Sequence, residues 1–128
     1  MPNLEKVLLV EDDLDIQIIG RLALETVGGL TLEACSSGQD CIQVAPQFRP
    51  DLILLDVMMP GMDGPTTLTA LKADPELASI PVVFMTAKVQ THEVESYKSM
   101  GAIGVIAKPF DPMTLATQVQ SLWNQHHD

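Results

Sequence analysis

One short stretch decides the fold, and it reads Asp51-Leu52-Ile53-Leu54-Leu55-Asp56. Four large aliphatic residues follow one another there without a polar residue between them, which is typical of a strand buried on both faces of a parallel sheet. Similar short apolar stretches recur along the chain. Together they predict five strands, at Lys6–Val10, Leu30–Ala34, Asp51–Leu55, Pro81–Met85 and Gly104–Ala107.

Segments with helical periodicity separate the predicted strands. We expect helices from Leu14 to about Val27, from Ser37 to about Phe48, over Pro65–Ala73, over Thr91–Met100, and after Asp111 as N-cap with Pro112 as first helical residue. The last helix is expected to bury Leu115, Val119, Leu122 and Trp123, which share one face. At Pro46, late in the second helix, we expect a kink or an early end, because proline has no amide donor.

The alternation of strand and helix predicts an α/β fold with a doubly wound five-stranded parallel sheet and helices on both faces. A chain of 128 residues can bury one core without disulfides, so we expect a single domain over residues 1–128. In open sheets of this kind, ligands bind beyond the carboxyl ends of the strands.

Composition excludes several classes of function. The formal net charge of -10 and the pI of about 4.4 argue against direct binding to nucleic acid or to anionic membranes, both of which need clustered Lys and Arg. No apolar run is long enough to span a membrane, and we expect a cytoplasmic protein. Cys35 and Cys41 are expected to be buried thiols without a chemical role, and His126 and His127 to be exposed.

Polar residues follow four of the predicted strands at their carboxyl ends. Glu11 and Asp12 follow the first, Asp56 the third, Thr86 the fourth and Lys108 the fifth. One such Asp could simply cap the next helix, but capping does not explain the whole set. Converging carboxylates repel one another unless a cation neutralises them, and carboxylate oxygens suit Mg2+. The set predicts phosphoryl transfer to a carboxylate, with Asp56 as the nucleophile.

These motifs resemble the receiver domain of two-component response regulators, and the resemblance covers essentially the whole chain in order. The stretches that carry it are Val10-Glu11-Asp12-Asp13, Asp51 to Gly64, Pro81 to Ala87, Gly101-Ala102 and Lys108-Pro109-Phe110. The resemblance implies a flavodoxin-like fold with strand order 2-1-3-4-5. It also implies a cis peptide bond between Lys108 and Pro109.

The resemblance also implies a role for each site residue. Asp56 would accept a phosphoryl group from a histidine kinase or a histidine phosphotransfer protein. Thr86 would be the switch hydroxyl and Lys108 the phosphate contact. Asp12, Asp56 and the backbone carbonyl of Met58 would bind Mg2+, with Glu11 acting through water.

One position departs from the family. Receivers commonly have Tyr or Phe three residues before the lysine, where this chain has Val105. Coupling of Asp56 to a downstream protein, expected at the face formed by the fourth helix, fifth strand and fifth helix, would then be weaker or built differently. We expect Tyr97 to be a surface or partner-contact residue that does not replace the missing ring.

Three other interpretations are open. A Mg2+-dependent aspartyl-phosphate hydrolase of related fold is disfavoured, because such enzymes need a second Asp two positions after the nucleophile and Met58 stands there. A scaffold that no longer takes phosphate would not need mutually repelling carboxylates. The third interpretation is a receiver taken from a longer regulator. We expect instead a regulator that is not an enzyme and has no output domain after the last helix.

Overall fold

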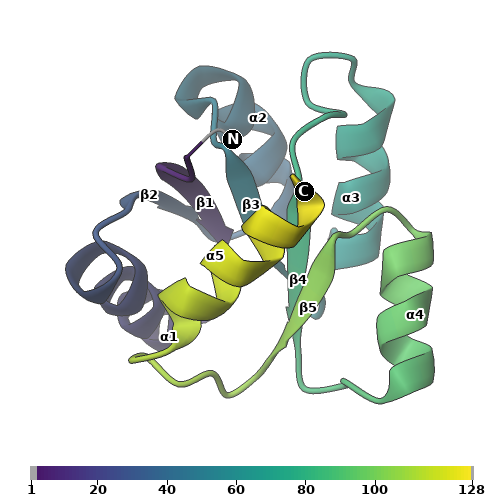
Figure 1. The fold of residues 1–128 in the computed structure, drawn as a ribbon. Coiled ribbons are helices and arrows are strands. Elements are labelled where there is room, and N and C mark those ends of the chain that lie inside the picture. The colour runs from purple at the N-terminus through teal and green to yellow at the C-terminus, as the bar shows by residue number, and fades with distance from the viewer. Residues whose placement is uncertain (1–2, 128) are drawn as a thin grey trace.

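The computed structural model describes residues 3–127 and shows alternating strands and helices (Figure 1). The strands are β1 (Lys6–Val10), β2 (Thr31–Cys35), β3 (Leu52–Asp56), β4 (Val82–Thr86) and β5 (Gly104–Ala107). The helices are α1 (Leu14–Arg21), the π-helical segment η1 (Leu22–Val27), α2 (Gly38–Phe48), α3 (Gly64–Ala73), α4 (Thr91–Ser99) and α5 (Leu115–His126). All five strands lie within one residue of the predicted bounds.

The strands form one parallel sheet in the order β2-β1-β3-β4-β5. The predicted flavodoxin-like order is therefore confirmed. Every residue of β3 and β4 is buried, which explains why these strands read as unbroken apolar runs. The parallel register brings the carboxyl ends of β1, β3, β4 and β5 to one edge of the sheet.

Helices cover both faces of the sheet, and each face has its own apolar cluster. One cluster joins the sheet to η1 and α5 through Ala23, Leu24, Leu115, Val119 and Trp123. The other joins the sheet to α2 and α3. Figure 1 shows α5 crossing in front of the strands, beside α1 and η1. No described helix has the length and apolar character that a membrane crossing requires.

The first helix has the predicted extent but not the predicted form. It is an α-helix to Arg21 and then widens to π-helical geometry over Leu22–Val27. Gly28 explains why the widened end can approach α5. A Cβ atom at Gly28 would lie 2.5 Å from the Cβ of Ala116, so any larger residue would push η1 away from α5.

Two expectations at helix ends are wrong. The early end expected at Pro46 does not occur, since α2 continues to Phe48 and ends where Arg49 adopts a left-handed φ of 54°. α5 begins at Leu115 with Thr114 as N-cap, not at Asp111. The Asp111 carboxylate instead accepts a hydrogen bond from the Met113 amide at 2.8 Å and holds a separate turn before the helix.

Side-chain burial agrees with most of the predicted pattern. Cys35 and Cys41 are free and buried. In α5, Leu115, Val119 and Trp123 are buried, whereas Leu122 is only half-buried. His126 is exposed, but His127 is half-buried because its ring stacks on Trp123 with the centroids 3.9 Å apart.

Candidate functional site

The candidate site lies at the carboxyl edge of the sheet. Glu11 follows β1, Asp56 ends β3, Thr86 ends β4 and Lys108 follows β5. Glu11, Asp56 and Thr86 are three of the few buried polar residues in the described chain, at 1%, 2% and 2% exposure. The predicted set is therefore brought together around a small polar centre at an otherwise apolar sheet.

Lys108 links the two buried carboxylates. Its Nζ lies 2.7 Å from Glu11 Oε1 and 3.3 Å from Asp56 Oδ1. Its backbone amide donates to the Thr86 carbonyl at 2.9 Å, and the bond to Pro109 is cis, as expected. Burial by itself would lower the pKa of Lys108, but the hydrogen bond to Glu11 and the charges of Asp56 and Glu11 outweigh it and raise that pKa.

Glu11 has an unusual protonation equilibrium. Burial raises its pKa from 4.5 to about 7, and the contact with Lys108 limits this rise. Its Oε2 accepts a hydrogen bond from the Asp13 amide at 3.2 Å. A bound cation favours the ionised form of a neighbouring carboxyl group. It therefore has a large effect on the charge of a carboxyl group that is half-protonated near neutral pH.

The carboxylates of Glu11, Asp12 and Asp56 can hold a divalent cation. One oxygen from each lies within 4.8 Å of the others, and Asp12 is exposed to incoming ions. Asp13, its neighbour, caps α1 instead, because its carboxylate accepts from the amides of Asp15 and Ile16. The capping role considered above for an Asp at a strand end thus belongs to Asp13. An all-oxygen donor set of this kind fits Mg2+.

Met58 and Thr86 complete the surroundings of Asp56. The Met58 amide donates to Asp56 Oδ1 at 3.3 Å, while the Met58 side chain is 70% exposed. The Thr86 hydroxyl oxygen accepts from the Lys88 amide at 3.0 Å. Since that oxygen acts as an acceptor, the hydroxyl proton of Thr86 is free to donate to another group.

The sequence did not single out Gln17 or Gly64. Gln17 Nε2 donates to the carbonyls of Glu11 and Cys35 at 2.8 and 3.2 Å, and so ties the ends of β1 and β2 to α1. A Cβ atom at Gly64 would lie 2.6 Å from the Asp56 carbonyl oxygen. The available signals were a single amide among the isoleucines of an amphipathic helix, and a glycine directly after Asp63, whose carboxylate caps α3.

Tyr97 lies at the edge of the core. It is half-buried, and its ring meets Phe84 edge-on with the centroids 5.2 Å apart. Its expected role as a partner contact stays a prediction. Val105 is half-buried and packs on the same cluster.

An apolar surface lies next to the site. Leu14, Ile18 and Leu22 recur along α1 and are 64%, 67% and 52% exposed. A hollow of about 270 Å³ on another face of α1 is lined by Ile16, Ile19, Lys108, Pro109 and Phe110. The hollow, and not the exposed row, reaches the lysine of the site.

Comparison with known proteins gives one consistent result. Residues 7–120 match the family model of the response regulator receiver domain. The chain is 32% identical over 124 residues to the DNA-binding response regulator MtrA of Mycobacterium tuberculosis, covering 97% of this chain and 53% of that protein. It is 36% identical over 94 residues to the probable transcriptional regulator ycf29 of Porphyra purpurea, covering 73% of this chain and 45% of that protein.

Solved structures show the same likeness. The chemotaxis protein CheY4 of Vibrio cholerae superposes with a TM-score of 0.85 at 28% identity, covering 94% of this chain and 99% of that chain. A putative response regulator from Chloroflexus aurantiacus gives a TM-score of 0.84 at 26% identity, with 95% and 99% covered. The chain spans about half the length of the two sequence relatives named above.

Proposed function

This chain belongs to the response regulator receiver domains, and on that premise we propose that Asp56 accepts a phosphoryl group from a histidine kinase or a histidine phosphotransfer protein. One observation carries the proposal. The Asp56 carboxylate is buried at the sheet edge, 3.3 Å from the Lys108 ammonium and beside two further carboxylates. A cation and an ammonium at that place are what a phosphoryl group needs on arrival.

The transfer step uses Asp56 as a nucleophile. Oδ1 already accepts from the Met58 amide and pairs with Lys108, which leaves Oδ2 to attack phosphorus. The new bond joins Oδ2 to phosphorus while the phosphorus–nitrogen bond to the donor histidine breaks, and the electron pair stays on the imidazole. Asp12, Asp56 and the Met58 carbonyl, with Glu11 through water, would hold Mg2+, which would supply positive charge for the phosphoryl oxygens.

Thr86 and Lys108 respond to the new group. The phosphoryl oxygens compete with Glu11 for the Lys108 ammonium, and the Thr86 proton donates to one of them. Both movements act on β4 and β5, because the Lys108 amide is bonded to the Thr86 carbonyl. We propose that the resulting change reaches a downstream protein at the face of α4, β5 and α5. With Val105 in place of an aromatic ring, this coupling is weaker or built differently than in receivers with Tyr or Phe there.

The phosphodonor approaches over α1 in this proposal. Its histidine must reach Asp56, and the exposed apolar residues Leu14, Ile18 and Leu22 lie on the helix that starts at the site. Burying such residues against a partner stabilises the complex without adding charge to an acidic surface. The hollow next to Lys108 can receive an apolar side chain of that partner.

We further propose that residues 1–128 form one receiver domain, which works in the cytoplasm through contacts with other proteins. The only chemistry of this domain would be the gain and loss of its own phosphoryl group. Met58 in place of a second Asp speaks against the hydrolase alternative. The names of MtrA and ycf29 refer to transcription, but the match to this chain covers only 53% and 45% of those proteins.

Incubation with Mg2+ and acetyl phosphate tests the proposal. We expect one added phosphoryl group by intact mass spectrometry, removed by hydroxylamine and absent in Asp56→Asn. Asp40→Asn, which alters an exposed carboxylate on α2, serves as the matched control and should be phosphorylated normally. A phosphoryl group that persists in Asp56→Asn, or none in the parent chain with Mg2+ and candidate kinases, would contradict the proposal.

A further inference from the structure

A single side chain holds the backbone that connects β1 to α1. The side-chain nitrogen Nε2 of Gln17 donates to the Glu11 carbonyl at 2.8 Å and to the Cys35 carbonyl at 3.2 Å. The same nitrogen donates to the Ser36 hydroxyl oxygen at 3.1 Å. An amide nitrogen carries two hydrogens, so these acceptors use all of its donor capacity. Because carbonyl oxygens can only accept, the contacts also settle which end of the Gln17 amide faces them.

The start of α1 fixes Gln17 in place. Its backbone amide donates to the Asp13 carbonyl at 2.9 Å, and the Asp13 carboxylate accepts from the amides of Asp15 and Ile16. Capping of this kind stabilises the first turn of a helix. The side-chain amide of Gln17 therefore extends from a firmly held backbone, which is what precise support of a site requires.

The Glu11 peptide is held from two sides. Its amide donates to the Cys35 carbonyl at 3.0 Å, and its carbonyl accepts from Gln17. A planar peptide bond joins that carbonyl to the amide of Asp12. Rotation of the peptide would break the bond from Gln17, so this bond sets the direction in which the backbone of Asp12 leaves β1.

The backbone matters most for Asp12, because no neighbour holds its carboxylate. The residue is exposed, and within residues 3–127 its carboxylate forms no hydrogen bond or ion pair. Glu11, in contrast, is held by the Lys108 ammonium at 2.7 Å. The place of the Asp12 carboxylate beside those of Glu11 and Asp56 therefore depends on the backbone that carries it.

We propose that Gln17 is a positioning residue of the cation site formed by Glu11, Asp12 and Asp56. Through the Glu11 carbonyl, its amide presents the Asp12 carboxylate where the three carboxylates can share one Mg2+. The inference rests on the function proposed above, because it concerns the same cation and the same phosphoryl acceptor. Groups that orient metal ligands without touching the metal commonly change metal affinity about 10- to 100-fold when they are replaced.

Two substitutions separate the hydrogen bonds of Gln17 from its shape and charge. Gln17→Met keeps an unbranched side chain of similar length but has no donor. Gln17→Glu keeps the shape and turns a carboxylate oxygen towards two carbonyl oxygens. It also adds a negative charge, which by itself would attract a cation. Weaker Mg2+ binding in both variants would therefore be an effect of geometry and not of charge.

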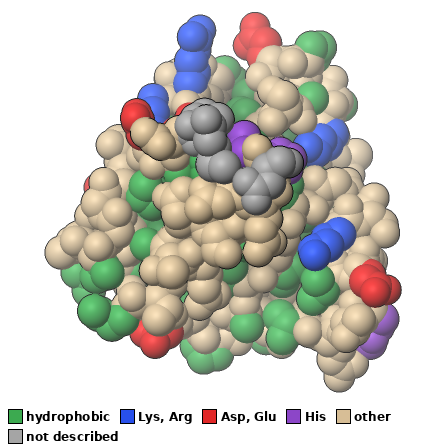
Figure 2. Space-filling model, in the orientation of Figure 1, with side chains coloured by type: hydrophobic (Ala, Val, Ile, Leu, Met, Phe, Trp, Pro, Cys, Tyr) green, Lys and Arg blue, Asp and Glu red, His purple; other side chains and the backbone are tan. Residues whose placement is uncertain are grey.

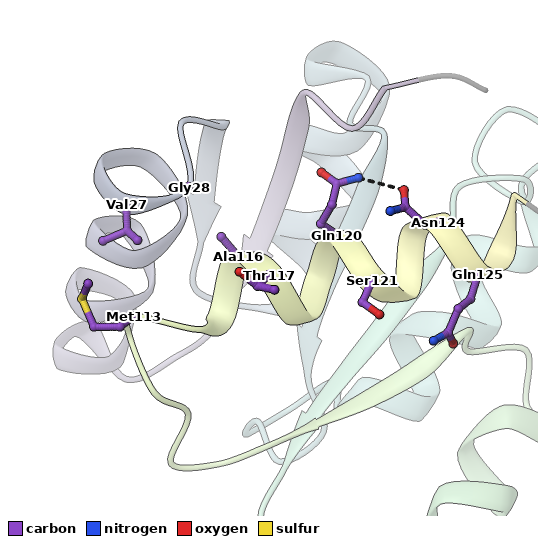
Figure 3. Close-up of a pocket in the computed structure, with 9 residues that line it drawn as sticks. All are labelled: Val27, Gly28, Met113, Ala116, Thr117, Gln120, Ser121, Asn124 and Gln125. Atoms are coloured by element: carbon purple, nitrogen blue, oxygen red, sulfur yellow. Dashed lines mark hydrogen bonds between the residues drawn. The ribbon is translucent and has the colours of Figure 1, made fainter.

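The helix α5 supplies a matched control. Gln120 is half-buried like Gln17, and its Nε2 donates to Asn124 Oδ1 at 3.0 Å (Figure 3). It lines a hollow of about 530 Å³ between α5 and the end of η1, and no residue of the cation site lines that hollow. Figure 2 shows the face that α5 crosses in Figure 1 as largely tan, with red and blue side chains towards the margins. Gln120→Met thus removes a comparable hydrogen bond away from the site.

Calorimetric titration of the full chain with MgCl2, without a phosphodonor, tests the proposal. We expect the dissociation constant for Mg2+ to rise about tenfold in Gln17→Met and in Gln17→Glu. It should change less than about twofold in Gln120→Met, which shares no partner with the site. Ser36→Ala leaves both carbonyl bonds of Gln17 in place and should also change it less than about twofold. Far-UV circular dichroism in EDTA checks that each variant is folded.

Phosphorylation by acetyl phosphate gives a second readout, which a merely structural role would not move in the same way. In Gln17→Met, the Mg2+ concentration that gives the half-maximal rate should rise about tenfold. The rate at saturating Mg2+ should return to within about twofold of the parent rate, because excess cation restores occupancy of the site. A variant that is only less well folded would stay slow at saturating Mg2+.

The outcomes separate this inference from the function on which it rests. An unchanged dissociation constant in Gln17→Met, or tighter binding in Gln17→Glu, would overturn the inference and leave the proposed function standing. A saturated rate that excess Mg2+ does not restore would overturn it as well. A parent chain that binds no Mg2+, or that takes no phosphoryl group at Asp56, would overturn the proposed function and this inference together.

Discussion

Glu11 makes the stability of the metal-free chain depend on pH in an unusual direction. Its pKa rises from 4.5 to about 7 on folding, so between these values the folded chain holds a proton that the unfolded chain has lost. The stabilisation is fully present below pH 4.5 and is lost as the pH rises through 7. At about 1.36 kcal/mol per pKa unit, the loss amounts to about 3 kcal/mol, a sizeable part of the stability of a small domain.

Glu11→Gln removes this dependence and keeps the size of the side chain. The assay is urea unfolding followed by far-UV circular dichroism in EDTA, from about pH 4 to pH 8.5, a range that brackets both pKa values. We expect the free energy of unfolding of the parent chain to fall by about 3 kcal/mol relative to the variant across this range. Subtracting the two curves cancels the shared titrating groups that do not contact Glu11.

A control and a second condition sharpen this test. Glu33→Gln, at an exposed carboxylate on β2, should leave the pH dependence of the parent chain unchanged. Saturating Mg2+ should remove much of the parent's loss at high pH, because the cation binds the ionised carboxylate. A difference between the parent and Glu11→Gln that stays flat from pH 4.5 to 7 in EDTA would refute the reasoning.

Three further predictions follow from the same site. Mg2+ affinity measured by calorimetry should fall about tenfold per pH unit below pH 7, because Glu11 must lose its proton to act; an affinity independent of pH would count against this role. The Lys108→Ala variant should still be phosphorylated at Asp56, but hydrogen exchange in α4 and β5 should no longer change on phosphorylation. A change in hydrogen exchange like that of the parent chain would show that Lys108 is not part of the switch. Gly64→Ala should lower the free energy of unfolding by about 2 kcal/mol in urea titration, because its Cβ would meet the Asp56 carbonyl, whereas Thr66→Ala, at an exposed position of α3, should cost less than about 1 kcal/mol.

The strands could be predicted because burial on both faces leaves a direct mark on the sequence. The stretch Leu52–Leu55 contains no polar residue, and all of its residues are buried in the structure. The convergence of Glu11, Asp56 and Lys108 followed from the same reasoning, since carboxyl ends of parallel strands meet at one edge. The strand order came from the family resemblance, because apolar runs alone do not say which strands are neighbours.

Local signals failed where tertiary contacts decide the geometry. Nothing in Leu22–Val27 marks a π-helix, and the close approach of Gly28 to Ala116 is visible only in three dimensions. Asp111 looks like an N-cap, yet its carboxylate closes a turn that ends before Leu115 enters the core. The positions of Gln17 and Gly64 depend in the same way on how α1 and α3 pack against the strand ends.

The connection between β1 and α1 leaves no room for insertions or deletions. The Glu11 amide donates a hydrogen bond to the Cys35 carbonyl. The Asp12 carboxylate belongs to the candidate cation site, and Asp13 caps α1. Three successive residues thus have three different fixed tasks. One added residue would turn α1 by about 100° relative to the strand and move Gln17 away from the carbonyls it binds. Chains that diverge from this one should therefore vary in length at exposed turns long before they vary here.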